Sequence, residues 1–272
     1  MAITPVDLQV TNITATSARL RWVNALQALI SSLFGAGEQG AIYIPMPIVN
    51  GVQALFQDSA GTVPVTDDGD PVGRMLDQSG NDYHAIQTVS GQRVIYRTDG
   101  TLHWLEGDGV DDFLRNTTVN FVMETSSTLV AGRQNVTGVQ GIFKAGSITS
   151  ESSGLSRTDN FILFRPSSTS AINDGNDLPS YNFGVPANTQ FVTEIHHRST
   201  GADFILNAVN VGSLSETIGS VSITNITILS SLPDLQFWDG RFYGAIMRST
   251  EMTAQNKTSS RQYLANLSGV TL

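Results

Sequence analysis

Short stretches of alternating apolar and polar residues, each followed by a turn sequence, make up most of the chain from residue 41 onward. Gly, Asn and Asp adopt the backbone conformations of tight turns, and they separate these stretches, as at residues 79–82 and 98–100. Strands are expected at residues 93–96, 102–106, 128–133, 141–144, 160–164, 191–196, 204–206 and 240–249. Many short strands without helical crossovers predict a mainly β protein, an antiparallel two-sheet sandwich.

Composition narrows the class of protein further. The 272 residues are enough to bury a large core, and the absence of cysteine excludes disulfides, thiolate zinc sites and thiol nucleophiles. The formal net charge is -9, and Lys144 and Lys257 are the only lysines, which argues against nucleic-acid binding. Every apolar run is far shorter than the roughly 20 residues that span a bilayer, so no membrane insertion is expected. Residues 1–5 lack the basic start of a signal peptide.

The N-terminal part has a different pattern. Residues 6–10 and 18–22 alternate in polarity and predict two short strands. Residues 24–34 predict a helix, and the Gly-rich residues 35–40 predict a linker. We therefore expect an attachment or oligomerisation segment at residues 1–40 and a sandwich domain at residues 41–272. A second short helix is expected at residues 259–267.

The predicted N-terminal helix carries an apolar stripe. Its members are Leu26, Leu29, Ile30 and Leu33, which follow one another at helical spacing. The stripe either packs on the helix's own domain or forms an assembly surface that pairs with sister subunits or a host particle. Both interpretations remain open from the sequence.

Several segments of the chain together resemble a known protein family. They are residues 55–66, 69–73, 76–81, 96–100, 102–106, 108–114, 242–246 and 263–270. They are similar to segments of bacteriophage and prophage virion proteins that carry a concanavalin A-like (laminin G-like) jelly-roll domain. Residues 43–48 depart from the family's aromatic-Asp-Pro-Ser-Asp stretch, and residues 149–186 match no part of it.

The resemblance implies a jelly-roll sandwich, synthesis in a bacterial host cytoplasm and a place in the virion. It implies a protein displayed on the particle surface, of the tail or head fibre or spike type, that contacts host-surface carbohydrate. The alternative is a capsid decoration or cementing protein with no ligand of its own. The expected partners are other virion proteins and further copies of the chain, as a homotrimer or another homo-oligomer.

Catalytic motifs are scarce. Glycoside hydrolysis needs two carboxyl groups about 5–10 Å apart, and the sequence offers Glu106 with Asp108, and Glu194. Asp108 and its neighbours Asp111 and Asp112 are expected to cap turn amides instead. No nucleophile elbow or phosphate-binding loop occurs. We therefore expect no enzyme, and a depolymerase with a carboxylate pair in a groove is the weaker alternative.

Metal and ligand sites have a few candidates. No cofactor is required, but the acidic run around Asp67 and Asp70 is a candidate calcium site, because calcium binds oxygen ligands. The adjacent His196 and His197 point to opposite faces of a strand, one expected buried and the other exposed.

Aromatic side chains in loops are candidates for stacking against sugars. They are Trp238, which precedes the last expected strand, and Tyr181 and Phe183. Trp104 lies inside an apolar strand and is expected in the core.

Overall fold

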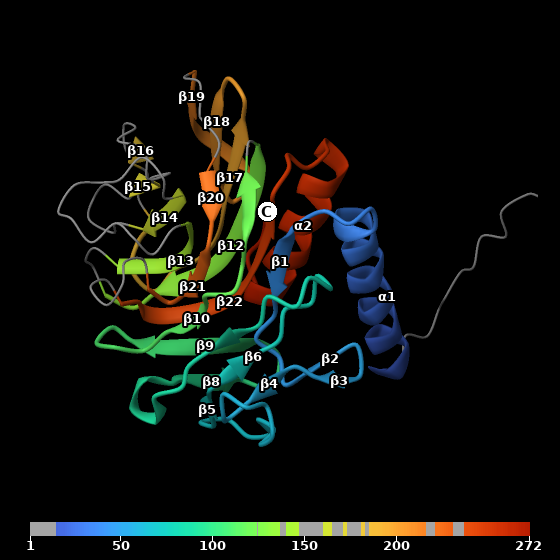
Figure 1. Ribbon diagram of the computed structural model, residues 1–272. Helices are drawn as coiled ribbons and strands as arrows, with labels where there is room; N and C mark the ends of the chain where they lie inside the picture. Colours follow the sequence, from blue (N-terminus) through green and yellow to red (C-terminus); the bar gives the residue numbers. More distant parts are fainter. Residues whose placement is uncertain are drawn as a thin grey trace, which may run out of the picture.

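The computed structural model shows a mainly β protein built from antiparallel sheets, with two helices against one face (Figure 1). Every strand pair in the described residues is antiparallel, which confirms the predicted fold class. The structure describes residues 15–123, 125–136, 140–146, 160–164, 171–172, 181–182, 185–215, 221–230 and 237–272.

The larger sheet contains nine strands among these described residues. In spatial order eight of them are β19 (Val209–Leu214), β18 (Gly201–Leu206), β17 (Gln190–Arg198), β12 (Ser126–Gln134), β22 (Asp239–Arg248), β9 (His103–Asp108), β8 (Val94–Thr98) and β5 (Pro71–Val72). The ninth, β1 (Gly40–Tyr43), pairs with β22.

The second sheet contains seven of the described strands. Their order is β14 (Asn160–Phe164), β13 (Gln140–Gly146), β21 (Asn225–Ile228), β10 (Leu114–Asn116), β7 (Ala85–Ile86), β6 (Arg74–Met75) and β4 (Leu55–Phe56). Three two-stranded pairs complete the described strands: β11 (Phe121–Met123) with β20 (Val221–Ile223), β15 (Ala171–Ile172) with β16 (Tyr181–Asn182), and β2 (Ile48–Val49) with β3 (Val52–Gln53). One 3-10 turn, η1, spans Ser90–Gln92 in the part of the chain that the structure describes.

Two hydrophobic clusters hold the layers together because successive strand residues face opposite sides of a sheet. One fills the space between the sheets and includes Phe143 of β13 and Phe242 of β22. The other lies between the nine-stranded sheet and the helices, and includes Tyr243 of β22 and Leu264. The nine-stranded sheet is therefore the middle layer. The helices pack on one of its faces and the second sheet packs on the other (Figure 1).

Helix α1 spans Ala15–Phe34, which corrects the prediction of a strand at residues 18–22. A five-residue alternation is too short to separate strand from helix. The whole span contains no glycine or proline and is rich in Ala and Leu, which favour helix. Residues 6–10, the other predicted strand, lie outside the described residues.

The apolar stripe of α1 packs on the protein's own domain. Leu26, Leu29 and Leu33 are at most 6% exposed, and Ile30 is half-buried against the same cluster. This corrects the assembly-surface interpretation for these four residues, because their side chains are buried against the sheet and the second helix. Arg248 of β22 also donates from Nε to the Leu33 carbonyl over 2.8 Å, which anchors the C-terminal end of α1.

The second helix, α2, spans Ala254–Ser268 and confirms the predicted C-terminal helix. The Thr253 side chain accepts a hydrogen bond from the Asn256 amide and caps its start. Gly269 ends it in the left-handed conformation at φ 73°, which glycine adopts without strain. No described helix is long and apolar enough to cross a membrane.

A buried polar network joins α2 to the central sheet. The Glu194 carboxylate of β17 is fully buried and accepts hydrogen bonds from the Arg261 guanidinium of α2, through Nη2 at 2.9 Å and also through Nε. His196 Nε2 lies 2.8 Å from the same carboxylate, and His196 Nδ1 lies 2.9 Å from Ser127 Oγ. Ser127 Oγ in turn accepts the Met252 amide hydrogen at 3.0 Å.

The protonation states complete this network. Burial raises the pKa of Glu194, but the hydrogen bonds from His196 and Arg261 outweigh it and hold the pKa below its usual range. Burial lowers the pKa of His196, so a neutral ring donates from Nε2 to Glu194 and accepts from Ser127.

The two adjacent histidines do point to opposite faces, as predicted. His196 faces α2, whereas the ring of His197 lies 3.2 Å from Ser126 Oγ, on the side opposite Ser127. Both are buried, at 1% and 4% exposure, so the prediction that one is exposed is wrong. β17 is covered on both faces, by α2 outside and by the second sheet inside.

Replacing Glu194 with Ala should lower the free energy of unfolding by about 3–5 kcal/mol, because it leaves a half-buried guanidinium without its carboxylate. The matched control is Glu251→Ala, which removes the more exposed partner of Lys257 and should cost at most about 1 kcal/mol. Urea unfolding at pH 7 measures both. Equal losses would show that the buried network does not hold α2 in place.

Candidate functional site

The structure changes the candidate glycan-contacting residues. Trp238 is 0% exposed, and its ring packs edge-on against Phe191 at 6.3 Å between centroids. The prediction that Trp238 contacts a ligand is therefore wrong, because the side chain fills the core between the sheets. The backbone of Tyr181 lies in β16, while its side chain and Phe183 lie outside what the structure describes.

The carboxylates of the predicted calcium residues accept hydrogen bonds from groups of their own turn. Asp70 Oδ2 accepts the amide hydrogens of Thr66 at 2.9 Å and Asp67 at 3.0 Å. Asp67 Oδ2 accepts the Thr66 hydroxyl at 2.9 Å. No third carboxylate or histidine among the described residues joins Asp67 and Asp70 at metal-ligand spacing. These two residues form a solvated acidic turn.

Two hollows flank the helices in the described part of the chain. One, of about 810 Å³, lies between α1 and α2, and the other, of about 400 Å³, lies among α1, the β2–β3 hairpin and α2. Neither is lined by a carboxylate or a guanidinium, and His103 is the one described histidine at their walls. Their linings of apolar and uncharged polar side chains offer little acid–base chemistry.

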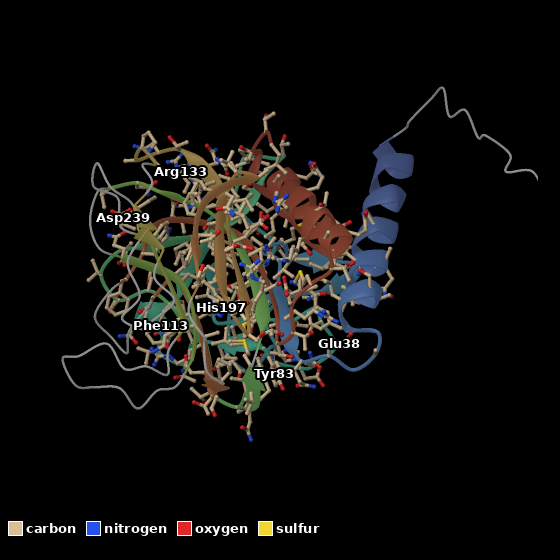
Figure 2. All side chains as sticks on the ribbon, turned by 90° about the horizontal axis from the view of Figure 1, so that it is seen from above. Glu38, Tyr83, Phe113, Arg133, His197 and Asp239 are labelled. Atoms are coloured by element: carbon tan, nitrogen blue, oxygen red, sulfur yellow. The ribbon has the colours of Figure 1, made fainter. Side chains whose placement is uncertain are left out.

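The polar groups converge instead where four strands begin or end. The ends of β9 and β12 meet the starts of β13 and β22, and Asp108 pairs directly with Asp239 in register. We call this edge the rim site; it comprises Asp108, Asp111, Asp112, Phe113, Asn135, Gln140, Phe237 and Asp239. Figure 2 places Phe113 and Asp239 on the side of the molecule away from α1.

Three carboxyl groups crowd together in the turn after β9. Oxygen atoms of Asp108, Asp111 and Asp112 all lie within 4.8 Å of one another, a spacing that would admit a divalent cation. Asp108 Oδ1 also accepts the amide hydrogens of Val110 at 2.8 Å and Asp111 at 3.4 Å, which confirms its predicted turn-capping role. The metal-ligand spacing thus occurs in a different acidic turn from the predicted one.

Asp112 has the most unusual environment of the three. It is 7% exposed, and burial raises its pKa to about 7, with further contributions from the charges of Asp108 and Asp111. The backbone amide of Asp108 opposes the shift but does not cancel it. The rim site therefore holds one carboxyl group that gains and loses its proton near neutral pH, beside two others.

Side-chain amides fix the other half of the rim site. Asn135 Nδ2 donates to Asp239 Oδ1 at 3.0 Å, and the Asp239 amide donates to Gln140 Oε1 at 2.9 Å. A Cβ atom at Gly109 would lie 2.8 Å from the Asp239 Cβ, so the acidic turn and this network touch. The arrangement is held by hydrogen bonds without any ligand, which lowers the cost of ordering it on binding.

Two half-buried rings border these groups. Phe113 and Phe237 lie 6.2 Å apart between ring centroids at an angle of 32°, and the Arg115 guanidinium lies 4.5 Å above the Phe113 ring. Phe113 directly follows Asp112, and Phe237 precedes Asp239 by two residues. The rim site thus combines apolar ring surface with carboxylates and amides, as binding sites for polar organic ligands do.

The sequence analysis missed most of these residues. Asn135, Gln140 and Phe237 lie just outside predicted strands, and their convergence depends on pairing between strands more than 100 residues apart. The dense acidic run at residues 108–112 is a visible signal, but the sequence favours turn capping for it, with Asp108 and Glu106 as the weaker catalytic alternative.

No protein-family model and no curated protein matches the chain. Solved structures do share its fold. An arabinofuranosidase complexed with arabinofuranosyl-α-1,2-xylobiose aligns with a TM-score of 0.57 and 12% identity, over 73% of this chain and 51% of its own. A GH54 α-L-arabinofuranosidase soaked with a cyclic sulfate inhibitor gives 0.56 at 12% identity, over the same shares. A Trypanosoma rangeli sialidase in complex with 2,3-difluorosialic acid gives 0.51 at 9% identity, over 93% of this chain and 39% of its own.

These structures overturn the expectation that the chain is not an enzyme, because the fold that it shares occurs in glycoside hydrolases. At 9–12% identity the likeness shows the fold alone. The chain spans about half the length of the arabinofuranosidases and two fifths of the sialidase.

Replacing Asp112 with Asn should stabilise the protein above neutral pH. The folded-state pKa is about 7, whereas the ordinary pKa of an Asp carboxyl is 3.8, so ionising Asp112 costs stability progressively as the pH rises from about 4 to 7. The variant should exceed the natural chain by up to about 4 kcal/mol at pH 8, and the advantage should vanish near pH 4.

Urea unfolding at pH 4, 6 and 8 measures this difference. Asp99→Asn is the control with the opposite sign, because amide hydrogens of Leu102 and Thr101 lower the pKa of that exposed carboxyl. If Asp112→Asn is less stable than the natural chain at pH 8, the assigned environment of Asp112 is wrong.

Proposed function

We propose that the chain is a bacteriophage virion protein, displayed on the particle, whose sandwich contacts host-surface glycans through the rim site. The resemblance to phage virion proteins supports the first part, and the segment at residues 108–114 that carries it forms the acidic turn of the rim site. The fold shared with saccharide-bound glycosidase structures supports the second part.

The single observation that carries the glycan proposal is the composition of the rim site. Carboxylates accept hydrogen bonds from sugar hydroxyls, and the amides of Asn135 and Gln140 offer both donors and acceptors. The rings of Phe113 and Phe237 supply the apolar surface on which the C–H face of a sugar packs.

The position of the rim also suits a displayed protein. α1 lies on the other side of the molecule (Figure 2). We propose that residues 1–40 provide the attachment to the particle, so that the rim faces outward. α1 contributes Leu26, Leu29 and Leu33 to the domain core, so this attachment cannot be an independent unit ending at residue 40.

Glycan arrays probed with the full chain test the glycan proposal. Phe237→Ala and Asn135→Ala should each weaken binding to any positive glycan by about tenfold, since each removes a contact worth roughly 1–2 kcal/mol. The control Val209→Ala alters an exposed apolar residue on the edge strand β19, which contributes no residue to the rim site, and it should leave glycan binding unchanged. Binding that all three variants retain would place the glycan elsewhere.

Glycoside hydrolysis is a second candidate, favoured by one observation. A carboxyl group with a pKa of about 7, Asp112, lies beside Asp108 and Asp111, with oxygen atoms of the three within 4.8 Å of one another, and retaining glycosidases use a pair of carboxyl groups roughly 5 Å apart. A general acid works best when its pKa is near the operating pH.

Release of 4-nitrophenol from a panel of 4-nitrophenyl glycosides tests this candidate. Hydrolysis at the rim site should fall as the pH rises through about 7, and Asp112→Asn should reduce it by at least about 100-fold. No release from any glycoside, or equal rates for the variant, would exclude the rim site as a catalytic centre.

A further inference from the structure

A row of polar side chains crosses the outer face of the nine-stranded sheet close to the rim site. In register, Glu106 of β9 lies opposite Arg241 of β22, Arg241 lies opposite Arg133 of β12, and Arg133 lies opposite Gln190 of β17. Phe242, next to Arg241, faces the core between the sheets, so Arg241 points to the other face. Both arginines are only partly exposed.

Neither of the two neighbouring arginines forms an ion pair with a described carboxylate. The charge of Arg241 adds to the backbone hydrogen bonds that lower the pKa of Asp99, without a direct contact between the two side chains. No carboxylate among the described residues lies within 4.0 Å of the guanidinium of Arg133 or Arg241. Glu106, the closest acidic residue in the row, accepts instead from Arg97 Nε at 3.1 Å. The Nε atoms of Arg133 and Arg241 are both buried without an acceptor.

The surroundings hold both guanidinium groups in place. Arg241 stacks on Trp104, with 4.1 Å from its Cζ to the ring centroid. Arg133 Nη2 donates to Asn135 Oδ1 at 3.0 Å and to Asn188 Oδ1 at 3.2 Å. These contacts orient the two cations without neutralising either.

Such a pair is unfavourable in the unliganded protein. Like charges directly opposite each other on neighbouring strands repel, and a partly buried charge without a partner loses hydration. The chain has 24 acidic and 15 basic residues, yet neither arginine forms an ion pair with a described carboxylate, and Glu106, opposite Arg241, pairs with Arg97 instead. An external anion would remove both costs.

We propose that Arg133 and Arg241 bind the negatively charged group of an acidic glycan, a carboxylate or a phosphate. Guanidinium groups bind such oxyanions through paired N–H donors. Asn135 contacts Arg133 through its oxygen and Asp239 through its nitrogen, so the anion site adjoins the rim site. The inference rests on the proposed glycan function, and it adds that the glycan is acidic.

Calorimetric titration of the full chain tests this with a matched pair of probes, tetragalacturonic acid and its methyl ester. The natural chain should bind the acid at least about tenfold more tightly than the neutral ester. Arg133→Gln and Arg241→Gln should each abolish most of that preference. Arg198→Gln, which alters an arginine already paired with Asp203, should leave it unchanged.

Thermal unfolding separates lost binding from lost structure. Without ligand, Arg133→Gln and Arg241→Gln should melt at or above the temperature of the natural chain, because each removes the like-charge repulsion. Lower melting of both variants would contradict the claim that the pair is unsatisfied.

A third probe, inorganic phosphate, identifies the source of the anion. Arginine-dependent binding of phosphate without binding of either tetrasaccharide would support the anion site and contradict the glycan function. Equal binding of acid and ester that both arginine variants retain would overturn the anion site and leave the glycan function standing. Binding of neither the acid nor phosphate would overturn the anion site.

Discussion

The arrangement of layers depends on the hydrogen bonds and the ion pair that the buried Glu194 carboxylate forms with Arg261 and His196. A carboxylate with no exposure to water is stable only where hydrogen bonds and an opposite charge replace hydration, and Arg261 and His196 supply them. Because Arg261 belongs to α2 and Glu194 to the centre of the sheet, the network fixes which part of the sheet the helices cover. The chain of hydrogen bonds continues through Ser127 to the start of the α2 segment at Met252.

Coverage of one part of the sheet leaves the other part open. The strands β12 and β22 run beneath the helices at Ser127 and Ile246, and they reach the rim at Arg133 and Asp239. The rim site and the pair Arg133 and Arg241 therefore lie at the end of these strands that the helices do not cover. One face of the sheet thus serves two purposes, stability where the helices pack and an exposed polar surface where they do not.

The sequence predicted the fold well and the site poorly, for physical reasons. Strand positions follow from local alternation, which is why residues 191–196 fall within β17 and residues 240–249 match β22 to within one residue at each end. The helix at residues 18–22 was mistaken for a strand because five residues carry too little periodicity. Trp238 was misplaced because its position before a strand does not reveal that Phe191, 47 residues earlier, packs against its ring. The arginine pair was invisible because Arg133 and Arg241 are 108 residues apart and meet only through strand register.

The proposed function unites these features in one orientation of the molecule, with α1 toward the particle and the rim outward. Electron microscopy of virions, with the chain resolved well enough to place α1 and the sandwich, tests this most directly. The account predicts projecting densities in which α1 lies proximal and the strand ends at Asp108 and Asp239 face the solvent. A rim packed against neighbouring capsid subunits would contradict it and favour a decoration protein, and absence of the chain from virions would contradict the virion proposal as a whole.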